Sequence, residues 1–524
     1  MATTEVKDYT GKKWDTIHRN GPFDLKRLYI TEHSDDPALR LFELYNDAAG
    51  EIQRLIKAAA DRNEGFRAYG SRWSMSSIAH QKDNLHMNAF LNIRLDIRPN
   101  ECHPDTSYLP ENLFFFECGN IIKEISEYID EFGKSIKASG ASNGQTIAGC
   151  ISTGVHGSGL DAGAVQDFVV GLNIITGPNP EDVVYLERAS KPALSDEFAA
   201  QINARVIRDV AIFNAALVSL GSFGFIHGVT IEAEDQFLLK RYIRKIPKKQ
   251  ALQLADTMNF KDSPVIIPEE VDENGKPNRP YHYKVFVNQY SKDPDYVVEF
   301  MYKKEFFSPY PDPFPVKRES LSQELISIFT TIAEKLPKAI PKLAKALEKT
   351  VLPVKDINKI VTGKLMEIFW DSEYKGPAFA ISFGVDHKDS SKVLDLLANL
   401  TVDKGPVPGI FAMRFVKQTQ ATIGFTKFPI TCMIEIDGLI WEGNRKIISL
   451  DDYARLMIEA LQESNIDFTI HWGKNAHWEQ EGLLEYMFDE NVVQQWKDAR
   501  NTLLSEQMQK VFSNQFIDVL GLSN

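Results

Sequence analysis

A glycine-rich stretch from Gly140 to Gly159 constrains this chain more than any other part of its sequence. Its twenty residues contain six glycines, mixed with serine, threonine and asparagine. Glycine lets a backbone approach a ligand closely, and successive exposed N–H groups in such turns form anion-binding concavities. The apolar residues Ile147, Ile151 and Val155 lie among them and favour a loop anchored in a core over a free linker. The stretch therefore predicts a binding loop for a phosphate or pyrophosphate.

Two further segments have the same character. A helix is predicted around Ile52, Ile56 and Ala59, which recur at helical spacing. A strand and a loop of small polar residues, Gly70–Ser74, follow it. Within residues 215–232, a second helix ends in a glycine turn and an alternating strand begins. Each of the three glycine-rich turns is thus expected next to a regular element.

The order and spacing of these segments resemble the FAD-binding module of the vanillyl-alcohol oxidase flavoprotein superfamily, over roughly residues 40–235. Far downstream, the residues His471-Trp472-Gly473-Lys474 are similar to a signature of the aldonolactone and alditol oxidase family. The resemblance implies an α+β protein with a two-subdomain PCMH-type FAD-binding module. It also implies a cap domain built on a mainly antiparallel sheet flanked by helices, and FAD as the cofactor.

Length and pattern divide the chain into parts. A chain of 524 residues is longer than one ordinary core requires. Its first forty residues are polar and are predicted to be an irregular lead-in. We expect an FAD-binding domain at 1–236 and a cap domain at 237–459, with a helical insertion at 321–365. The C-terminal segment, 460–524, is expected to return to the FAD-binding domain.

Composition limits the partners and the compartment. The net charge of −13 argues against nucleic acid or an anionic membrane as the main partner. The four cysteines (Cys102, Cys118, Cys150 and Cys432) lack metal-like spacing and are predicted to be free thiols in a reducing compartment. With no apolar leader or spanning run, a cytoplasmic location is predicted. The locally basic insertion is expected to be a packed helical hairpin, with a lid, a dimer face and a membrane-surface helix as alternatives.

The resemblance assigns the cofactor to backbone and small side chains of the three turns. Trp73 occupies the position at which covalent members of the family have the histidine that binds the flavin, and an indole has no nucleophilic nitrogen available for that bond. We therefore predict non-covalent FAD. The predicted cofactor-binding residues are Arg67, Gly70, Ser71, Arg72, Trp73, Ser74, Gly140, Ala141, Ser142, Gln145, Thr146, Gly149, Ser152, Thr153, Gly154, His156, Gly157, Ser158, Gly221, Gly224 and Ile226.

The implied reaction, oxidation of an alcohol carbon by hydride transfer to the flavin, requires a positive group beside the flavin and an acceptor for the hydroxyl proton. The family signature implies Lys474 for the first role, with His471 near the flavin. The family's Glu-x-Arg pair has lost its glutamate to alanine here, and Arg414 remains. On the next predicted strand, Glu435 and Asp437 share one face. Glu435 is predicted to act as a base or to orient a hydroxyl, with a structural ion pair as the alternative.

Several substrates and functions follow from the resemblance. Sugar lactones and alditols are the implied substrates, but the lost glutamate and the helical insertion leave a bulkier lipophilic alcohol as an alternative. The small residues Gly140 and Ala141 over the flavin ring favour an oxidase, with dioxygen as the electron acceptor, over a dehydrogenase. A flavin electron-relay subunit and a flavin-binding protein without turnover are the other hypotheses. The oligomeric state stays open.

Overall fold

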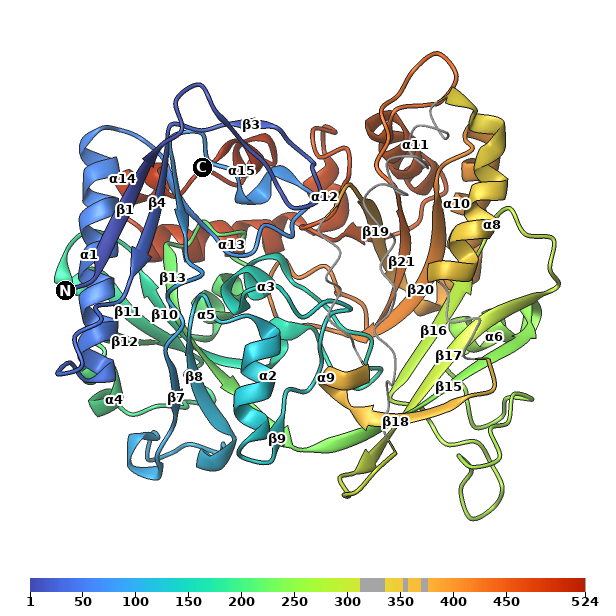
Figure 1. Ribbon diagram of the computed structural model, residues 1–524, viewed down its shortest axis with the longest axis horizontal. Helices are drawn as coiled ribbons and strands as arrows, with labels where there is room; N and C mark the ends of the chain where they lie inside the picture. The colour runs from blue at the N-terminus through green and yellow to red at the C-terminus, as the bar shows by residue number, and fades with distance from the viewer. Residues whose placement is uncertain (312–334, 352–356, 369–375, 524) are drawn as a thin grey trace.

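The computed structural model describes residues 1–311, 335–351, 357–368 and 376–523. Two sheets and both termini lie in one half of the molecule, and one large sheet lies in the other half (Figure 1). Helices pack against all three sheets, which confirms the predicted α+β class. The helices of the first half begin with α1 (Leu41–Asp61), α2 (Ile122–Asp130), α3 (Ile147–Thr153), α4 (Asp196–Gln201) and α5 (Val210–Leu217).

The first sheet has four strands in the order β1-β4-β6-β5, of which β4, β6 and β5 are parallel. These strands are β1 (Thr3–Asp8), β4 (Arg27–Glu32), β5 (Phe66–Tyr69) and β6 (Asn84–Met87), and the short strands β2 (Lys13–Trp14) and β3 (Phe23–Asp24) pair separately. The prediction of an irregular lead-in is therefore wrong. Strand β4 pairs with β6, which comes some fifty residues later in the chain. The sequence around β4 therefore contains no sign of this partner.

The second sheet has six strands in the order β12-β11-β10-β13-β8-β7. Its strands are β7 (Arg94–Asp96), β8 (Leu113–Glu117), β10 (Val169–Ile175), β11 (Val183–Glu187), β12 (Arg205–Arg208) and β13 (Phe225–Glu232), and β9 (Lys134–Ser135) pairs with β14 (Glu234–Asp235) beside it. The central strand β10 is buried along its whole length, as expected for a continuous apolar run covered on both faces. Helix α1 contacts β4 of the first sheet and β10 of the second, and its buried face includes Ile52, Ile56 and Ala59 as predicted.

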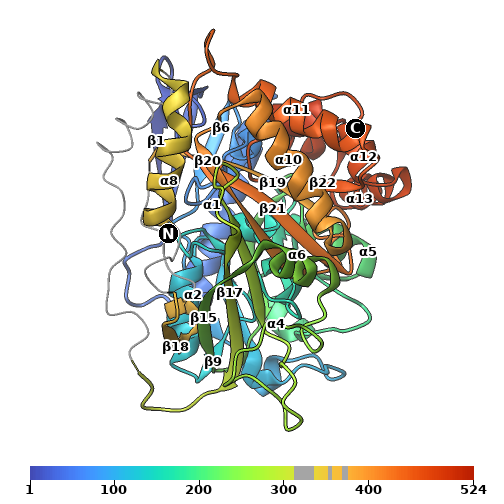
Figure 2. The same ribbon diagram turned by 90° about the vertical axis from the view of Figure 1, so that its right-hand side faces the viewer.

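A fully antiparallel sheet of eight strands forms the other half, which confirms the cap architecture expected from the resemblance. In the order β18-β15-β17-β16-β20-β21-β19-β22, its strands are β18 (Ile360–Lys364), β15 (Phe237–Pro247), β17 (Asp295–Glu305), β16 (His282–Val287), β20 (Gly409–Lys417), β21 (Ile430–Gly438), β19 (Phe379–Asp386) and β22 (Phe468–Ile470). Figure 2 shows α8 (Ile340–Val351) on one side of this sheet and α6 (Lys248–Thr257) and α10 (Ser390–Lys404) on the other, with α11 (Leu450–Glu463) next to α10.

The predicted helical insertion at 321–365 is only partly helical. Helix α8 is present, but β18 is a strand that pairs with β15 and extends the large sheet, and the short α9 (Leu365–Ile368) follows it. Ranges 321–334 and 352–356 of the insertion lie outside the described residues. The predicted helical hairpin is therefore not tested as a whole.

After β22 the chain crosses back to the first half. The helices that follow are α12 (Leu483–Met487), α13 (Glu490–Leu503), α14 (Glu506–Val511) and α15 (Gln515–Val519). Helix α13 packs against α5, and α14 packs against α1. The indole Nε1 of Trp496 donates a hydrogen bond to the carbonyl of Val218 at 3.0 Å. The division of the chain into 1–236, 237–459 and 460–524 stays a prediction.

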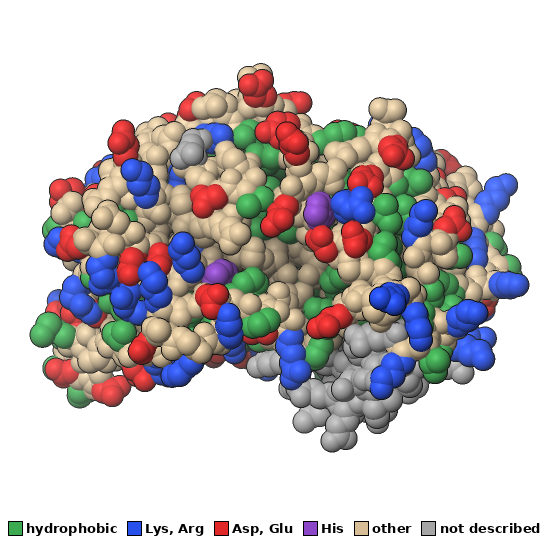
Figure 3. All heavy atoms as spheres, turned by 90° about the horizontal axis from the view of Figure 1, so that it is seen from above, with side chains coloured by type: hydrophobic (Ala, Val, Ile, Leu, Met, Phe, Trp, Pro, Cys, Tyr) green, Lys and Arg blue, Asp and Glu red, His purple; other side chains and the backbone are tan. Residues whose placement is uncertain are grey.

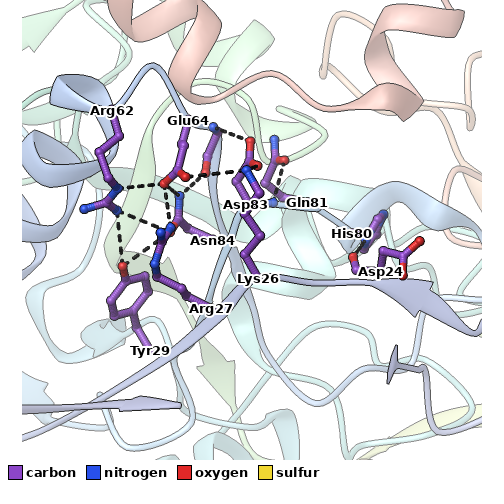
Figure 4. A network of polar contacts seen from close by, with 11 residues as sticks. Asp24, Lys26, Arg27, Tyr29, Arg62, Glu64, His80, Gln81, Asp83 and Asn84 are labelled. Atoms are coloured by element: carbon purple, nitrogen blue, oxygen red, sulfur yellow. Dashed lines mark hydrogen bonds and ion pairs between the residues drawn. The ribbon is translucent and has the colours of Figure 1, made fainter. Parts of the chain in front are cut away.

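A polar network around Glu64 stabilises the edge of the first sheet (Figure 4). The Oε2 atom of Glu64 accepts hydrogen bonds from Arg27 and Arg62 at 2.7 Å each and from Asn84 at 3.2 Å. Burial alone would raise the pKa of Glu64, but the hydrogen bonds from Arg62 and Asn84 lower it to about 2. The network thus links the end of α1 to β4 and β6.

One face of the molecule carries mixed charge. Acidic and basic side chains alternate over the face in Figure 3, without one continuous patch of a single sign. In the part of the chain that the structure describes, no helix combines the length and the apolarity that crossing a bilayer requires.

Candidate active site

A cavity of about 320 Å³ lies between the two halves of the molecule. All three glycine-rich turns contribute to its walls, and the large sheet and the loop after β22 close one end. It brings together most of the residues that were predicted as a site. Of these, the lining residues are Arg67, Gly70, Ser71, Arg72, Trp73, Ser74, Gly140, Ala141, Ser142, Gln145, Thr146, Gly149, Ser152, Thr153, His156, Gly221, Gly224, Ile226, Arg414, His471 and Lys474.

Four predicted residues lie outside the cavity wall. Gly154 ends α3 in the left-handed conformation (φ 70°) and packs against Phe425. Gly157 and Ser158 follow His156 on the side away from the cavity, and Glu435 lies behind Arg414.

Sequence reasoning missed several lining residues. The clearest are His18, from the segment predicted to be an irregular lead-in, Asn88, which directly follows β6, and Phe512, from the C-terminal helices. None lies in a glycine-rich turn. Only the long-range packing of the chain brings them to the cavity, so no local sequence signal marks them.

The turns adopt backbone conformations that depend on their residues. A Cβ atom at Gly70 would lie 1.9 Å from Thr146 Oγ1, so only glycine fits there. Arg72 and Leu220 both have positive φ, 60° and 50°. A non-glycine residue in this region is strained and persists where its surroundings enforce it, often at a functional site. The stretch Gly140–Gly159, predicted as one long loop, contains the two-turn helix α3 in its middle.

The loop after β22 is hydrogen-bonded to the first glycine-rich turn. The N–H of Met75 donates to the carbonyl of Gly473 at 2.8 Å, and the Ser76 hydroxyl donates to the carbonyl of Trp472 at 2.7 Å. The ring of His471 stacks on Phe425, with centroids 4.4 Å apart. These contacts hold the His471–Lys474 segment at the end of the cavity.

Arg414 and Glu435 form a buried ion pair on adjacent strands. Glu435 is in register with Ala412, which is two residues before Arg414. The side chains of Arg414 and Glu435 therefore lie diagonally on one face of the sheet. Arg414 Nε and one terminal nitrogen donate to the two carboxylate oxygens at 2.6 and 2.5 Å. Burial alone would raise the pKa of Glu435, but Arg414 holds it well below its usual range. Asp437, on the same face, is exposed.

Two neutral histidines and one lysine complete this end of the cavity. Burial lowers the pKa of His156 to about 3, and burial together with His156 and Lys474 lowers that of His471 well below its usual value. Their ring centroids are 5.5 Å apart. The ammonium group of Lys474 is half-buried and makes no ion pair with any described residue. Across the described ranges, no group of three or more His, Cys, Asp or Glu side chains is placed to hold a metal ion.

Comparisons with known proteins agree on the fold. A family described as FAD binding domain matches residues 45–181. A cholesterol oxidase from B. sterolicum superimposes with a TM-score of 0.70 at 12% identity, over 99% of this chain and 97% of its own. The chain has the PCMH-type FAD-binding fold. The predicted resemblance to the vanillyl-alcohol oxidase superfamily is confirmed.

Sequence relatives of this PCMH-type protein are lactone oxidases. D-arabinono-1,4-lactone oxidase from Kluyveromyces lactis is 29% identical over 242 residues, which is 46% of this chain and 37% of the relative. L-gulonolactone oxidase 3 from Arabidopsis thaliana is 32% identical over 123 residues, 23% of this chain and 19% of the relative. The matched segments thus span little more than a third of the fungal relatives' own length.

Proposed function

We propose that this protein is an FAD-dependent oxidoreductase that oxidises an alcohol carbon, with dioxygen as the electron acceptor. One observation carries the proposal. A single cavity is lined by the three glycine-rich turns along its length and by Arg414, His471 and Lys474 at the end that meets the large sheet. Such a cavity offers a cofactor site and a group of polar side chains at one end of it, which is how active sites are commonly built.

The residues of the cavity fit FAD. The side-chain oxygens of Ser142, Gln145 and Thr146 are buried in its wall without hydrogen-bond partners, as expected of groups that await a polar ligand. Among the described residues, buried Arg67 bonds to the carbonyls of Leu220 and Phe512 and has no carboxylate within ion-pair distance, so an anionic group would suit it. When bound, FAD supplies the acceptor for a hydride, and dioxygen takes the two electrons onward to give peroxide.

We propose roles for the groups at the sheet end of the cavity. Lys474 stabilises negative charge that develops on the cofactor and substrate, because it is a half-buried cation that forms no ion pair with a described carboxylate. Arg414 binds and orients the substrate, and Glu435 fixes the orientation of Arg414 through two hydrogen bonds. His471 packs between Phe425 and His156 and excludes water from this end.

Two substrate classes are supported by different observations. The lactone oxidase relatives favour a sugar lactone or alditol. The second class is a lipophilic alcohol, because Ala412 lies in an apolar cluster with Ile410, Phe286 and Ala344 of α8, next to Arg414. The fold shared with a cholesterol oxidase is compatible with this second class.

Non-covalent FAD is part of the proposal. Trp73 lies in the cavity wall, where its ring closely approaches Gly144. The four cysteines are free and buried, and none lines the cavity. The free thiols also favour a reducing compartment such as the cytoplasm. The ring centroids of His18 and Trp73 are 5.4 Å apart. If acid does not release the flavin, His18 is the first residue to examine for a covalent bond to it.

The visible spectrum of the purified protein tests this proposal first. Flavin bands are expected, and they should pass into the supernatant after acid precipitation. The bound flavin should then be bleached anaerobically by one member of a panel containing D-arabinono-1,4-lactone, xylitol and cholesterol, and peroxide should form in air. A protein that takes up no FAD would refute the proposal. Bleaching without peroxide would favour a dehydrogenase or an electron-relay subunit, and bound flavin without any bleaching would favour a protein without turnover.

A further inference from the structure

His156 lines the cavity, and its buried ring nitrogen Nε2 has no hydrogen-bond partner among the described residues. It follows α3 in the chain and is 2% exposed. Its ring meets Phe425 edge-on, with centroids 5.6 Å apart, and lies beside His471. These neighbours fix the orientation of the ring.

A hydrogen bond determines which nitrogen of His156 carries the proton. Its Nδ1 lies 2.8 Å from the carbonyl oxygen of Gly157. A carbonyl oxygen only accepts, so Nδ1 must carry the hydrogen and donate it. In the neutral ring Nε2 then bears a lone pair, and this atom is buried with no hydrogen-bond partner. The protonated, positively charged form of the ring is disfavoured. Burial, Arg414 and Lys474 all lower the pKa of His156, and Glu435 opposes them only in part.

The neighbouring carboxylate is less suited to accept a proton. Both oxygens of Glu435 already accept from Arg414, and Oε1 lies 3.7 Å from His156 Nε2. Two acceptors thus face each other, and no described residue donates a hydrogen bond to His156 Nε2. A hydroxyl group that donates to Nε2 would satisfy the imidazole. It would leave the ion pair of Glu435 intact.

We propose that His156 Nε2, and not Glu435, accepts the proton of the substrate hydroxyl. This inference rests on the proposed oxidation of an alcohol. The O–H bond breaks and an Nε2–H bond forms, while the C–H bond breaks and its hydride passes to FAD, so that the C–O bond becomes a carbonyl. Glu435 is then a positioning residue, whose negative charge beside Nε2 stabilises the imidazolium that forms. The proton later leaves to solvent.

The test compares His156→Gln with Glu435→Gln in the FAD-bound protein. Glutamine keeps a hydrogen-bond acceptor but cannot take the proton. The rate of anaerobic flavin reduction, with the panel compound that bleaches the wild-type protein fastest, should fall about 10²–10⁴-fold in His156→Gln. The fall in Glu435→Gln should be smaller. Affinity for FAD, measured by titrating the apoprotein and following flavin fluorescence, should change less than threefold in His156→Gln.

Chemical rescue and a matched control distinguish a proton acceptor from a structural side chain. Free imidazole should restore part of the rate in His156→Ala, increasingly as the pH rises through the pKa of imidazole itself. His86→Gln is the control, because His86 is equally buried but lies outside the cavity and bonds through Nε2 to Thr31. It should reduce the flavin within twofold of the wild-type rate.

Three outcomes would overturn the assignment. If Glu435→Gln is the slower variant and imidazole restores nothing, Glu435 is the base. If His156→Gln loses FAD affinity rather than rate, Nε2 binds the cofactor. If both variants keep the wild-type rate, neither residue takes the proton. A wild-type protein that no alcohol bleaches would instead refute the proposed function itself, and that result is known before any variant is made.

Discussion

Glu64 and Glu435 are both carboxylates held by arginine, but their surroundings differ. Glu64 accepts hydrogen bonds from two arginines and an asparagine at the edge of the first sheet (Figure 4), and it does not line the cavity of the candidate site. In the described part of the chain, Glu435 accepts hydrogen bonds from Arg414 alone, and His156 Nε2, an acceptor that no described donor reaches, lies 3.7 Å from its Oε1. Arg414, which holds Glu435, lines the cavity of the candidate site.

The comparison shows that an ion pair by itself does not mark a functional site. Both pairs lower the pKa of the glutamate, so the charge state does not distinguish them. The difference lies in the unfilled hydrogen-bonding capacity next to Glu435, because a stable protein rarely leaves buried polar atoms without partners. Four variants would break or sharpen this comparison.

Arg414→Met should cost the most stability. It leaves the Glu435 carboxylate buried and unpaired, which typically costs about 3–5 kcal/mol. Arg27→Met is the matched change, and it should cost about 1 kcal/mol because Glu64 keeps Arg62 and Asn84. Thermal unfolding of the three proteins measures the difference. The double variant Arg414→Met/Glu435→Leu should recover most of the loss, and a double variant as unstable as Arg414→Met would contradict the explanation.

Lys474→Met should chiefly affect turnover. Removal of one group that stabilises negative charge in the transition state costs about 2.7–4 kcal/mol, which is about 10²–10³-fold in kcat. FAD should remain bound. Lys427→Met is the control, since Lys427 pairs with Asp467 outside the cavity. Steady-state oxidation of the panel compound measures both variants, and unchanged turnover in Lys474→Met would remove the assigned role.

Glu64→Gln should show a dependence on pH. The folded pKa of about 2 lies below the ordinary value near 4.3, so the stabilisation by Glu64 is fully present above that value. It is lost as the pH falls toward 2. At pH 7 the variant should lose about 1–2 kcal/mol, after allowance for the partial exposure of the network. Unfolding midpoints from pH 7 to pH 3 should converge, and a constant difference would disprove the link to ionisation.

Gly149→Ala should have the smallest effect on stability and a measurable effect on the cofactor. The added methyl would meet only Thr146 Oγ1, at 3.1 Å, and otherwise project into the cavity. Replacing a helical glycine by alanine raises the free energy of unfolding by about 0.5–1 kcal/mol. The affinity for FAD should instead fall about tenfold, which is about 1.4 kcal/mol of binding free energy. Gly50→Ala in α1 meets nothing and should leave FAD affinity unchanged. Wild-type affinity in Gly149→Ala would mean that FAD does not use this wall.

The sequence predicted the parts of the site that local chemistry determines. Glycine marks places where another group approaches the backbone closely, so Gly70 could be assigned to the cavity wall. Gly149 was assigned with it and lines the cavity from within helix α3. The two-residue period of a strand placed Glu435 on one face of β21, on the side where Arg414 lies. His18 could not be predicted, because it reaches the cavity through contacts with distant residues, among them Trp73 and Gly376. The free nitrogen of His156 depends on a hydrogen bond that no sequence pattern encodes.

The return of the chain after β22 also affects when the protein can mature. Arg67, in strand β5 just before the first glycine-rich turn, donates a hydrogen bond to the carbonyl of Phe512, 445 positions later, at 3.4 Å. At about 5–20 residues per second, a ribosome needs about 20–90 s to make the chain between them. Throughout that time the cavity lacks its C-terminal wall, and the half that emerges first cannot enclose a cofactor. FAD is therefore expected to be captured only after synthesis is complete, and a chain that stops before Phe512 should leave the ribosome as a colourless protein.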